Sequence, residues 1–330
     1  SKRNLMEGYL TMRGSKGTGR FGCIVVSLAA FAALLAGCGA APESAGEIPL
    51  SPEVSRASGN GYTYYLIEDG TLMAWGESYS TTDYDQRQPV FHGAQSVWTR
   101  RFGALVLDQE GDLWTSDSLG LEGSREREGM WYVLSDVVCA TGSVWNSAAV
   151  CADGSLWTWG RNASGELSNG EIAEDGAPLP PQHIMDGVRA VRAGTYAITL
   201  DRALYRFGEG CLQPRHVMDN VADAARAKGE EVQVLTPEGE LFLLSAPEDP
   251  SQDQALPDIP VATQVRRVFD GGYQLEDGAF RLWAPGEAEA IPLEREAELV
   301  VQNMDEFMII PAGGQPEFIR LEGRQVKYRQ

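Results

Sequence analysis

Cysteine and histidine, which build most metal and nucleophilic sites, are scarce in this sequence. It holds five Cys and three His in 330 residues, with no CxxC or HxxxH pair. A Walker loop and a nucleophile elbow are also missing. The histidines, His92, His183 and His216, each lie beside a proline-containing segment in separate parts of the chain, so we expect them far apart and structural. The sequence therefore predicts no catalytic residue, no metal site and no cofactor.

Positive charge is also scarce. The chain has 27 Lys and Arg against 47 Asp and Glu, a formal net charge of −20. From Cys38 onward it carries 22 basic and 46 acidic residues, a net charge of −24. A surface this acidic repels nucleic acid and anionic lipid. We therefore expect no nucleic-acid partner, and we interpret the acidity as a solvated exterior.

The one long apolar run, residues 21–36, is short for a membrane span. It follows Arg13, Lys16 and Arg20 and ends in Leu-Ala-Gly before Cys38. A basic start, an apolar core and small residues before a cleavage point are typical of a secretory signal. The ending resembles the bacterial lipobox, which implies lipidation of Cys38. A retained membrane-anchor helix is the alternative.

The resemblance predicts three parts for the chain. Residues 1–37 form a signal region that is cleaved before Cys38, and residues 38–52, rich in Ala, Pro, Ser, Glu and Gly, form a flexible tether. Residues 53–330 form the folded domain. The expected location is the extracytoplasmic face of a bacterial cell membrane, where the lipid anchors the protein.

A short phrase recurs about every 40 residues along the rest of the chain. It reads Asp-Gly-Thr-Leu-Met-Ala-Trp-Gly at 69–76 and Asp-Gly-Ser-Leu-Trp-Thr-Trp-Gly at 153–160, with weaker copies elsewhere. Repeats of this period indicate one supersecondary unit used many times. The turn positions of the seven copies are Gly70, Gly111, Gly154, Arg202, Gly239, Gly278 and Gly314.

Each copy predicts a β-hairpin, because β-branched and aromatic residues flank an acidic-Gly turn. A proline-containing segment follows the hairpin in several copies, for example at 181–184, and it fits an edge strand. A Val-rich segment, for example 188–191, then leads into the next hairpin. Four short strands per unit make the blade of a propeller. The sequence therefore predicts an all-β, seven-bladed β-propeller of four-stranded blades.

The phrase at 153–160, continued by Arg-Asn-Ala-Ser-Gly-Glu-Leu at 161–167, resembles the regulator-of-chromosome-condensation repeat. The resemblance covers roughly residues 50 to 330, is strong in the first and third copies, and is degenerate in the fifth to seventh. It implies a seven-bladed propeller. It implies no single activity, because the fold hosts nucleotide exchange, enzyme inhibition and general protein binding.

The remaining cysteines leave two interpretations open. Cys139 and Cys151 lie on successive strands of the third blade, so an antiparallel pairing could bring them together as a disulfide in an oxidising compartment. Buried free thiols are the alternative, because Cys packs as a small apolar residue. Cys211 has no evident partner in the sequence.

Tryptophans fall into two groups. Trp75, Trp114, Trp157 and Trp159 recur at fixed places in the repeat, so we expect them to pack between neighbouring blades. Other aromatic and arginine residues occupy loops between the first two strands of a blade, where propellers often bind partners and where hot-spot residues gather. The predicted binding ring, for which partly buried loop anchors are the alternative interpretation, is Tyr62, Trp98, Arg100, Arg101, Trp145 and Tyr196.

Three functional hypotheses follow. The first is a non-catalytic binding or scaffold module for a protein or a cell-envelope polymer, held at the membrane by its lipid. The second is a propeller inhibitor of a secreted enzyme. The third is a polysaccharide lyase or hydrolase, which would require carboxylates or aromatic residues converging at one end of the channel.

Overall fold

The structure is a computed structural model that describes residues 50–77, 84–173, 175–245, 257 and 259–329. The predicted signal region, Cys38 and most of the predicted tether lie outside these residues. Within them the chain is all β apart from short 3-10 turns such as η2 (Tyr84–Gln86). No helix among these residues is long and apolar enough to cross a membrane.

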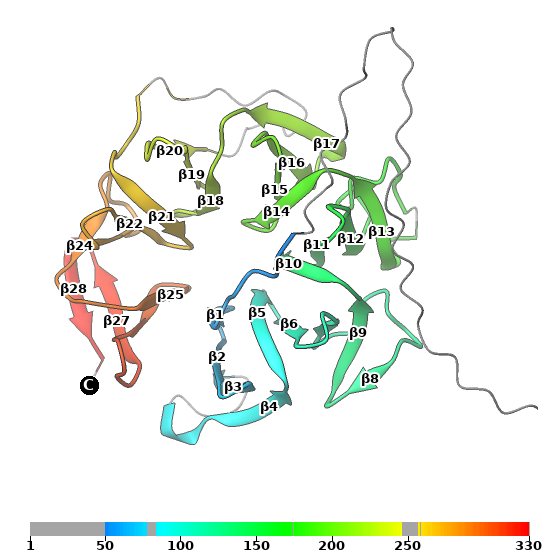
Figure 1. Ribbon diagram of the computed structural model, residues 1–330, viewed down its shortest axis with the longest axis horizontal. Helices are drawn as coiled ribbons and strands as arrows, with labels where there is room; N and C mark the ends of the chain where they lie inside the picture. Colours follow the sequence, from blue (N-terminus) through cyan, green and yellow to red (C-terminus); the bar gives the residue numbers. More distant parts are fainter. Residues whose placement is uncertain (1–49, 78–83, 174, 246–256, 258, 330) are drawn as a thin grey trace, which may run out of the picture. The chain divides into compact units, whose positions relative to one another are not determined.

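The strands form seven antiparallel sheets arranged as the blades of a propeller, as predicted (Figure 1). Blade 1 consists of β1 (Ala57–Gly59), β2 (Thr63–Glu68), β3 (Thr71–Gly76) and β4 (Gln88–His92). Blade 2 consists of β5 (Ala94–Arg100), β6 (Gly103–Asp108), β7 (Leu113–Thr115), β8 (Glu126–Arg127) and β9 (Met130–Leu134). Blade 3 consists of β10 (Val137–Gly142), β11 (Asn146–Cys151), β12 (Leu156–Gly160) and β13 (Leu179–Met185).

The other four blades complete the circle. Blade 4 consists of β14 (Val188–Arg192), β15 (Tyr196–Thr199), β16 (Leu204–Gly208) and β17 (Cys211–Met218), and blade 5 of β18 (Asp223–Arg226), β19 (Val232–Leu235) and β20 (Leu241–Leu244). Blade 6 consists of β21 (Val265–Phe269), β22 (Gly272–Leu275), β23 (Phe280–Leu282) and β24 (Ile291–Leu293). Blade 7 consists of β25 (Leu299–Asn303), β26 (Glu306–Ile310), β27 (Glu317–Glu322) and β28 (Gln325–Tyr328). Five blades have four strands; blade 2 has five, and blade 5 has three plus an isolated bridge between Leu241 and Ala262.

The recurring acidic-Gly phrase forms the turn of the central hairpin. In blade 1, Glu68 pairs with Thr71, so the loop has only two residues, Asp69 and Gly70. Their φ angles are 49° and 76°. Positive φ at both positions is the type I′ turn that matches the twist of a hairpin, and Gly adopts it without steric cost. The acidic-Gly pair of the phrase is thus the turn signal, and the Leu and Trp of the phrase lie on the third strand, β3.

The core consists of seven clusters, one at each interface between neighbouring blades. The tryptophan prediction is confirmed for Trp75, Trp114 and Trp159, which are 0%, 5% and 1% exposed in three of these clusters. Trp157 is only partly buried at the edge of the same cluster as Trp159. These clusters lie within the compact unit Glu47–Gln330, called the propeller fragment below, so that fragment retains every one of these core contacts.

The ring closes between blade 7 and blade 1 by side-chain packing, because each of these blades is built from consecutive strands. Tyr64 stacks on Trp75 at 5.5 Å between ring centroids, and Phe318 of blade 7 packs edge-on against Tyr64 at 5.1 Å. The hydroxyl of Tyr64 donates to Glu306 across the interface at 2.9 Å. Burial raises the pKa of Tyr64, so this donor keeps its proton.

The chain already contacts the propeller at Leu50, whose N–H donates to the carbonyl of Ala152 at 3.2 Å. The N–H of Glu53 then donates to Val138 at 2.7 Å, and the N–H of Val97 donates to Ser55 at 2.9 Å. The segment 50–56 is therefore hydrogen-bonded to both blade 2 and blade 3 before β1 begins. Its residues 50–52 were assigned by the sequence to the tether.

Cys139 and Cys151 are free buried thiols, the second of the two interpretations that the sequence leaves open, and the possible disulfide is not formed. The register shifts between Val137 and Cys139, and Cys139 pairs with Val150 instead of Cys151. Because of this bulge, Cys139 packs in the cluster toward blade 4, and Cys151 packs in the cluster toward blade 2. The two sulfurs point to opposite faces of the sheet, which no disulfide can span.

We expect the thiols of the propeller fragment to resist alkylation by iodoacetamide at pH 8 while the protein is folded. Burial raises the pKa of Cys139 and of Cys151 to about 11, and the thiolate is the reactive form. Mass spectrometry should show no rapid modification of either thiol in buffer and complete modification in denaturant without reductant. A mass two units lower with two unreactive cysteines in denaturant would show a disulfide instead.

Candidate functional site

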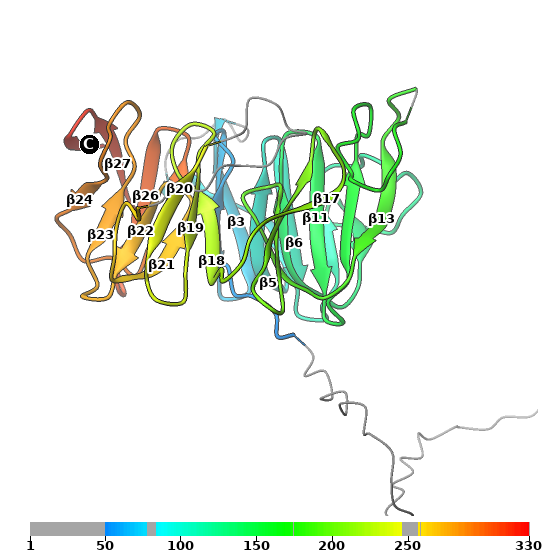
Figure 2. The ribbon, with the colours of Figure 1, turned by 90° about the horizontal axis from the view of Figure 1, so that it is seen from above.

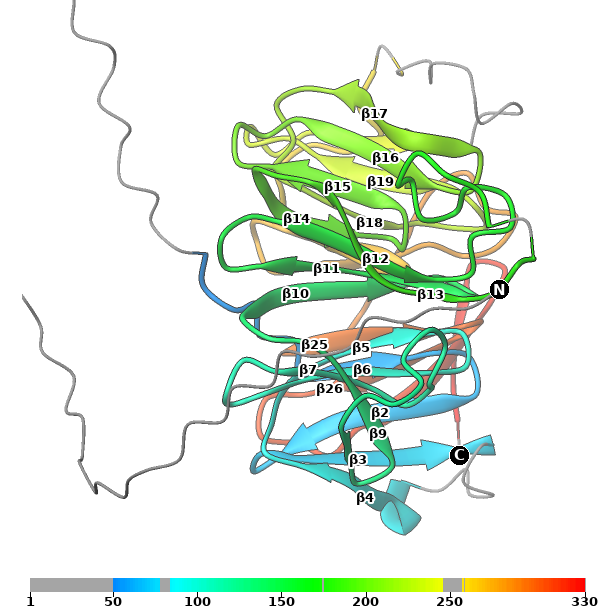
Figure 3. The same ribbon diagram turned by 90° about the vertical axis from the view of Figure 1, so that its right-hand side faces the viewer.

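The two ends of the propeller differ in the loops that they carry. We call the loop between the first and second strand of each blade its inner loop. Because the strands run from one end of the propeller to the other, the acidic-Gly turns lie at one end and the inner loops at the other (Figures 2 and 3). The segment before β1 emerges at the end with the acidic-Gly turns, because Leu50 bonds to Ala152 beside such a turn. In Figure 2 this blue segment leaves the lower edge.

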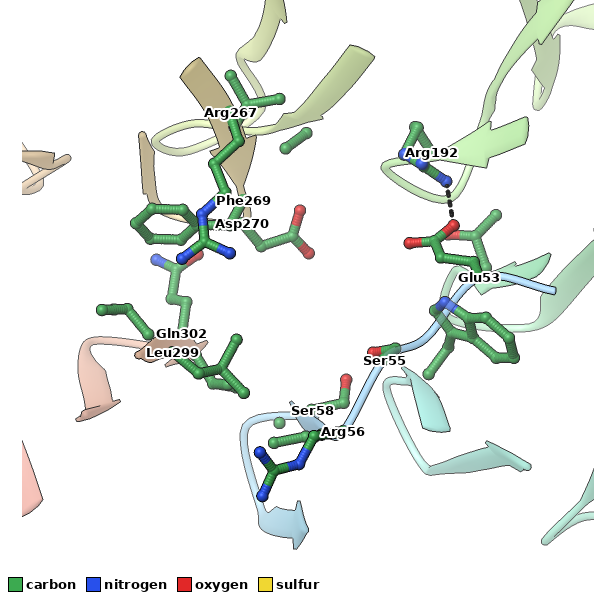
Figure 4. A pocket seen from close by; sticks show the side chains of 18 of the residues that line it. Glu53, Ser55, Arg56, Ser58, Arg192, Arg267, Phe269, Asp270, Leu299 and Gln302 are labelled. Atoms are coloured by element: carbon green, nitrogen blue, oxygen red, sulfur yellow. Dashed lines mark hydrogen bonds and ion pairs between the residues drawn. The ribbon is translucent and has the colours of Figure 1, made fainter. Parts of the chain in front are cut away.

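The central channel holds a cavity of about 470 Å³ lined by the inner strands and by the segment 53–59 (Figure 4). Arg192 binds Glu53 at 2.9 Å and Asp223 at 2.7 Å on one side. Burial acts to lower the pKa of Arg192, but the two carboxylates outweigh it and raise the pKa above its ordinary value. These charges are paired with one another, so they tie the N-terminal segment to blade 4 rather than offer a reactive group.

A second cavity of about 550 Å³ lies at the other mouth of the channel. Inner loops supply most of its lining, including residues 60–62, Arg101, Lys228 and Met304. The carboxylates of Asp270 and Asp305 also line it. It is therefore an open mouth of mixed charge.

Large apolar side chains stand in the inner loops of four consecutive blades, 7, 1, 2 and 3. We call these four residues, Met304, Tyr62, Phe102 and Trp145, the apolar arc. Met304, Phe102 and Trp145 are 61%, 53% and 44% exposed, and Tyr62 is half-buried. The side chain of Met304 lies against Gly61, next to Tyr62. Ring centroids are 6.3 Å apart from Tyr62 to Phe102 and 5.6 Å apart from Phe102 to Trp145.

Two exposed arginines lie on the rings of the arc. The guanidinium of Arg101 is 5.6 Å from the centroid of Phe102, and that of Arg161 is 5.4 Å from the centroid of Trp145. Such cation–π contacts hold a guanidinium in place while its donors stay available. Neither arginine forms an ion pair within the described part of the chain. The inner loops of blades 4, 5 and 6 carry smaller or charged residues instead, so the arc occupies one side of the mouth.

The structure brings together three residues of the predicted ring, Tyr62, Arg101 and Trp145. It places the other three in structural positions. Tyr196 begins β15 and is 4% exposed in the core between blades 4 and 5. Trp98 is half-buried between two core clusters, with its remaining surface on the channel cavity.

Arg100 is the clearest correction. Its side chain is 1% exposed, forms an ion pair with Asp117, and donates to the carbonyl of Val144 at 3.1 Å. Burial lowers the pKa of Arg100, and the carboxylate of Asp117 opposes that shift. Arg100 thus links blades 2 and 3, and its side chain offers almost no surface to a partner.

Sequence reasoning missed Phe102, Met304 and Arg161. Phe102 directly follows Arg101, so the same loop argument could have included it. Met304 lies in the degenerate seventh copy, where the repeat gives little help with alignment. Arg161 belongs to the phrase itself and looked like part of the repeat.

The histidines lie on outer strands of three different blades, as predicted. His92 is on β4, His183 on β13 and His216 on β17. Each pairs with a nearby carboxylate on the surface, at 2.8–3.0 Å. Among the residues that the structure describes, no group of three or more His, Cys, Asp or Glu is arranged to hold a metal ion.

Comparison with protein-family models finds no match, and a search of curated protein sequences finds none either. Solved structures share the fold. Human WBSCR16 matches with a TM-score of 0.59 and 18% identity over 76% of this chain and 85% of that chain. PorZ of Porphyromonas gingivalis matches with a TM-score of 0.55 and 11% identity over 85% of this chain and 38% of that chain.

Yeast RCC1 (Prp20) matches with a TM-score of 0.49 and 13% identity over 80% of this chain and 69% of that chain. The β-propeller fold is therefore what the chain shares with WBSCR16 and PorZ.

Proposed function

We propose that this protein is a non-catalytic binding module whose contact surface is the apolar arc. The arc is the observation that carries the proposal. Exposed large apolar side chains normally occur singly on a soluble protein, and a contiguous row marks an interaction site. Tyr, Trp and Arg are the residues that most often dominate binding energy at protein interfaces. The partner is a protein or a cell-envelope polymer, as the sequence suggests.

We further propose that Cys38 is lipidated and holds the propeller on the outer side of a bacterial membrane. The predicted tether of about 15 residues would reach on the order of 20 Å. Because Leu50 leaves the ring at the end opposite the inner loops, this attachment would present the arc away from the membrane. PorZ, which shares the fold, is described as a bacterial surface component of a secretion system, so such a propeller can serve at a cell surface. The inhibitor and lyase hypotheses have no specific observation in their favour.

The proposal is tested by capture from bacterial envelope extracts with the immobilised propeller fragment. We expect the wild type to retain a defined species and a Phe102→Ser/Trp145→Ser variant to retain at least tenfold less of it. Truncation of a hot-spot residue costs about 2 kcal/mol or more of binding free energy, and each 1.4 kcal/mol is about tenfold in affinity. Quantitative mass spectrometry or carbohydrate analysis of the bound fraction measures it.

Leu200→Ser is the matched control, because Leu200 is 51% exposed beside the turn of β15 and β16, at the opposite end of the propeller. It should retain the same species as the wild type. Equal retention by the arc variant, or nothing retained above background, would contradict the proposed function.

A further inference from the structure

Within the proposed function, we infer that the apolar arc receives a peptide segment of a partner protein that alternates apolar side chains with carboxylates. The inference rests on the arc being the contact surface and adds the chemistry of its partner. The arginines of the arc, the contacts of its rings and the charges around it each support one part of this description.

Arg101 and Arg161 call for negative charge on the partner. Both are exposed and lack an ion pair within the described residues, although the chain has far more carboxylates than basic groups. Arg125 and Arg324, elsewhere on the surface, have carboxylate partners, at 3.1 and 3.5 Å. Arg202 and Arg266 are also exposed without an ion pair among the described residues, but neither lies on an aromatic ring. A guanidinium held on an aromatic ring presents a planar set of donors that matches a carboxylate. The arc is therefore a place where the protein leaves its scarce positive charge free.

The contacts of the rings favour a peptide over a sugar chain. A sugar binds an aromatic residue by lying flat on the face of its ring. Tyr62 stacks on Phe102 with only 16° between the ring planes, and Arg101 lies over Phe102 as well. Arg161 lies over Trp145. These contacts partly cover the ring faces, so less ring surface is left for a sugar to lie on, while the exposed parts of Phe102 and Trp145 can still contact apolar side chains of a peptide.

Neighbouring carboxylates define where such a segment can lie. Glu166, close to Trp145, accepts a hydrogen bond from the N–H of Ser164 at 2.7 Å, and Asp305, next to Met304, pairs with Arg320 at 3.3 Å. Asp270 lines the mouth cavity and accepts from the N–H of Arg226 at 2.9 Å. The centre of the mouth gives a partner carboxylate no net preference, because Arg226 and Lys228 line it together with Asp270 and Asp305. The segment therefore follows the arc from blade 1 to blade 3, where Arg101 and Arg161 lie.

The test uses random 12-residue peptides displayed on phage and selected on the propeller fragment. We expect enriched peptides to carry Asp or Glu beside aromatic or branched apolar residues. Synthetic copies, measured by fluorescence anisotropy, should bind at least tenfold more weakly to Arg101→Gln/Arg161→Gln than to wild type, and more weakly as salt rises. Arg324→Gln, which removes a charge on the outer rim of blade 7, should bind as the wild type does.

Three outcomes would overturn the inference: no enriched peptide, enriched peptides without acidic residues, or unchanged binding to Arg101→Gln/Arg161→Gln. Binding of polygalacturonate at the arc in preference to peptides would also overturn it, in favour of an anionic polymer. These results differ from a failure of the proposed function. If Phe102→Ser/Trp145→Ser loses the envelope species while the arginine variant keeps it, the arc is the site and only the partner chemistry is wrong.

Discussion

Trp75→Ala is expected to lower the free energy of unfolding of the propeller fragment by about 3–5 kcal/mol. Trp75 is 0% exposed, the largest side chain in the cluster that joins blade 7 to blade 1. Its loss removes dispersion contacts to Tyr64 and to Phe318 and leaves a cavity that the flanking sheets cannot easily collapse. The loss falls on the interface that closes the ring.

This interface differs from the other six because its two blades lie at opposite ends of the folded chain. Among the described residues no loop connects blade 7 to blade 1, so the contact is maintained by packing and by a few polar links. The hydrogen bond from Tyr64 to Glu306 and the ion pair from Arg56 to Glu298, both at 2.9 Å, are two of these links. The ion pair is exposed and contributes little, which leaves the aromatic cluster as the main term.

Chemical denaturation followed by tryptophan fluorescence and circular dichroism measures the effect as a shift in the denaturant midpoint. Trp157→Ala is the control for the loss of one tryptophan, because Trp157 is only partly buried and should cost clearly less. A Trp75→Ala variant as stable as Trp157→Ala would show that the cluster between blades 7 and 1 does not hold the ring closed.

The sequence could predict the blades because each level of the repeat points to the same structure. Asp69 and Gly70 specify the turn, Leu72 and Trp75 on the strand that follows pack on its two opposite faces, and the proline segments suit outer strands. Local turn chemistry and the apolar pattern are both readable without tertiary information. The same consistency explains why three of the four fixed-offset tryptophans, Trp75, Trp114 and Trp159, were placed correctly in the core between blades.

The sequence could not predict which face each inner-strand residue occupies. The first strand pair is irregular at the same place in four blades: at Ala94/Ser96, Val137/Cys139, Val188/Ala190 and Val265/Arg267. One extra residue in a strand reverses the facing of the residues beyond it. Cys139 therefore lies on the opposite face of the sheet from Cys151, and no feature of the amino-acid sequence marks the bulge.

Loop residues were misjudged for a related reason. Tyr62 and Tyr196 looked equivalent because both stand near the start of a second strand. Tyr62 is the last residue of its inner loop, whereas Tyr196 is the first residue of β15 and points into the core. A difference of one residue thus separates a site residue from a buried one, and boundaries of this accuracy depend on the pairing between strands.

Asp117→Ala is expected to destabilise the propeller fragment by about 3–5 kcal/mol, more than Arg100→Met. Removing the carboxylate leaves the guanidinium of Arg100 buried, with a side chain that is 1% exposed, and without its ion-pair partner. Burial already lowers the pKa of Arg100, and Asp117 is the group that opposes this. Arg100→Met instead replaces the buried charge by an apolar chain of similar length, while Asp117, at 25% exposure, can still reach water.

A double-mutant cycle separates this structural role from the binding role that the sequence suggested. The Arg100→Met/Asp117→Ala variant should recover much of the stability that Asp117→Ala loses, because no unpaired charge then remains between blades 2 and 3. Denaturant midpoints of the wild type and three variants measure the coupling, and capture of the envelope species by Arg100→Met should match the wild type. Two results together would show that Arg100 belongs to the binding surface instead. The stability changes of the two single variants would be additive, and Arg100→Met would lose capture of the envelope species without losing stability.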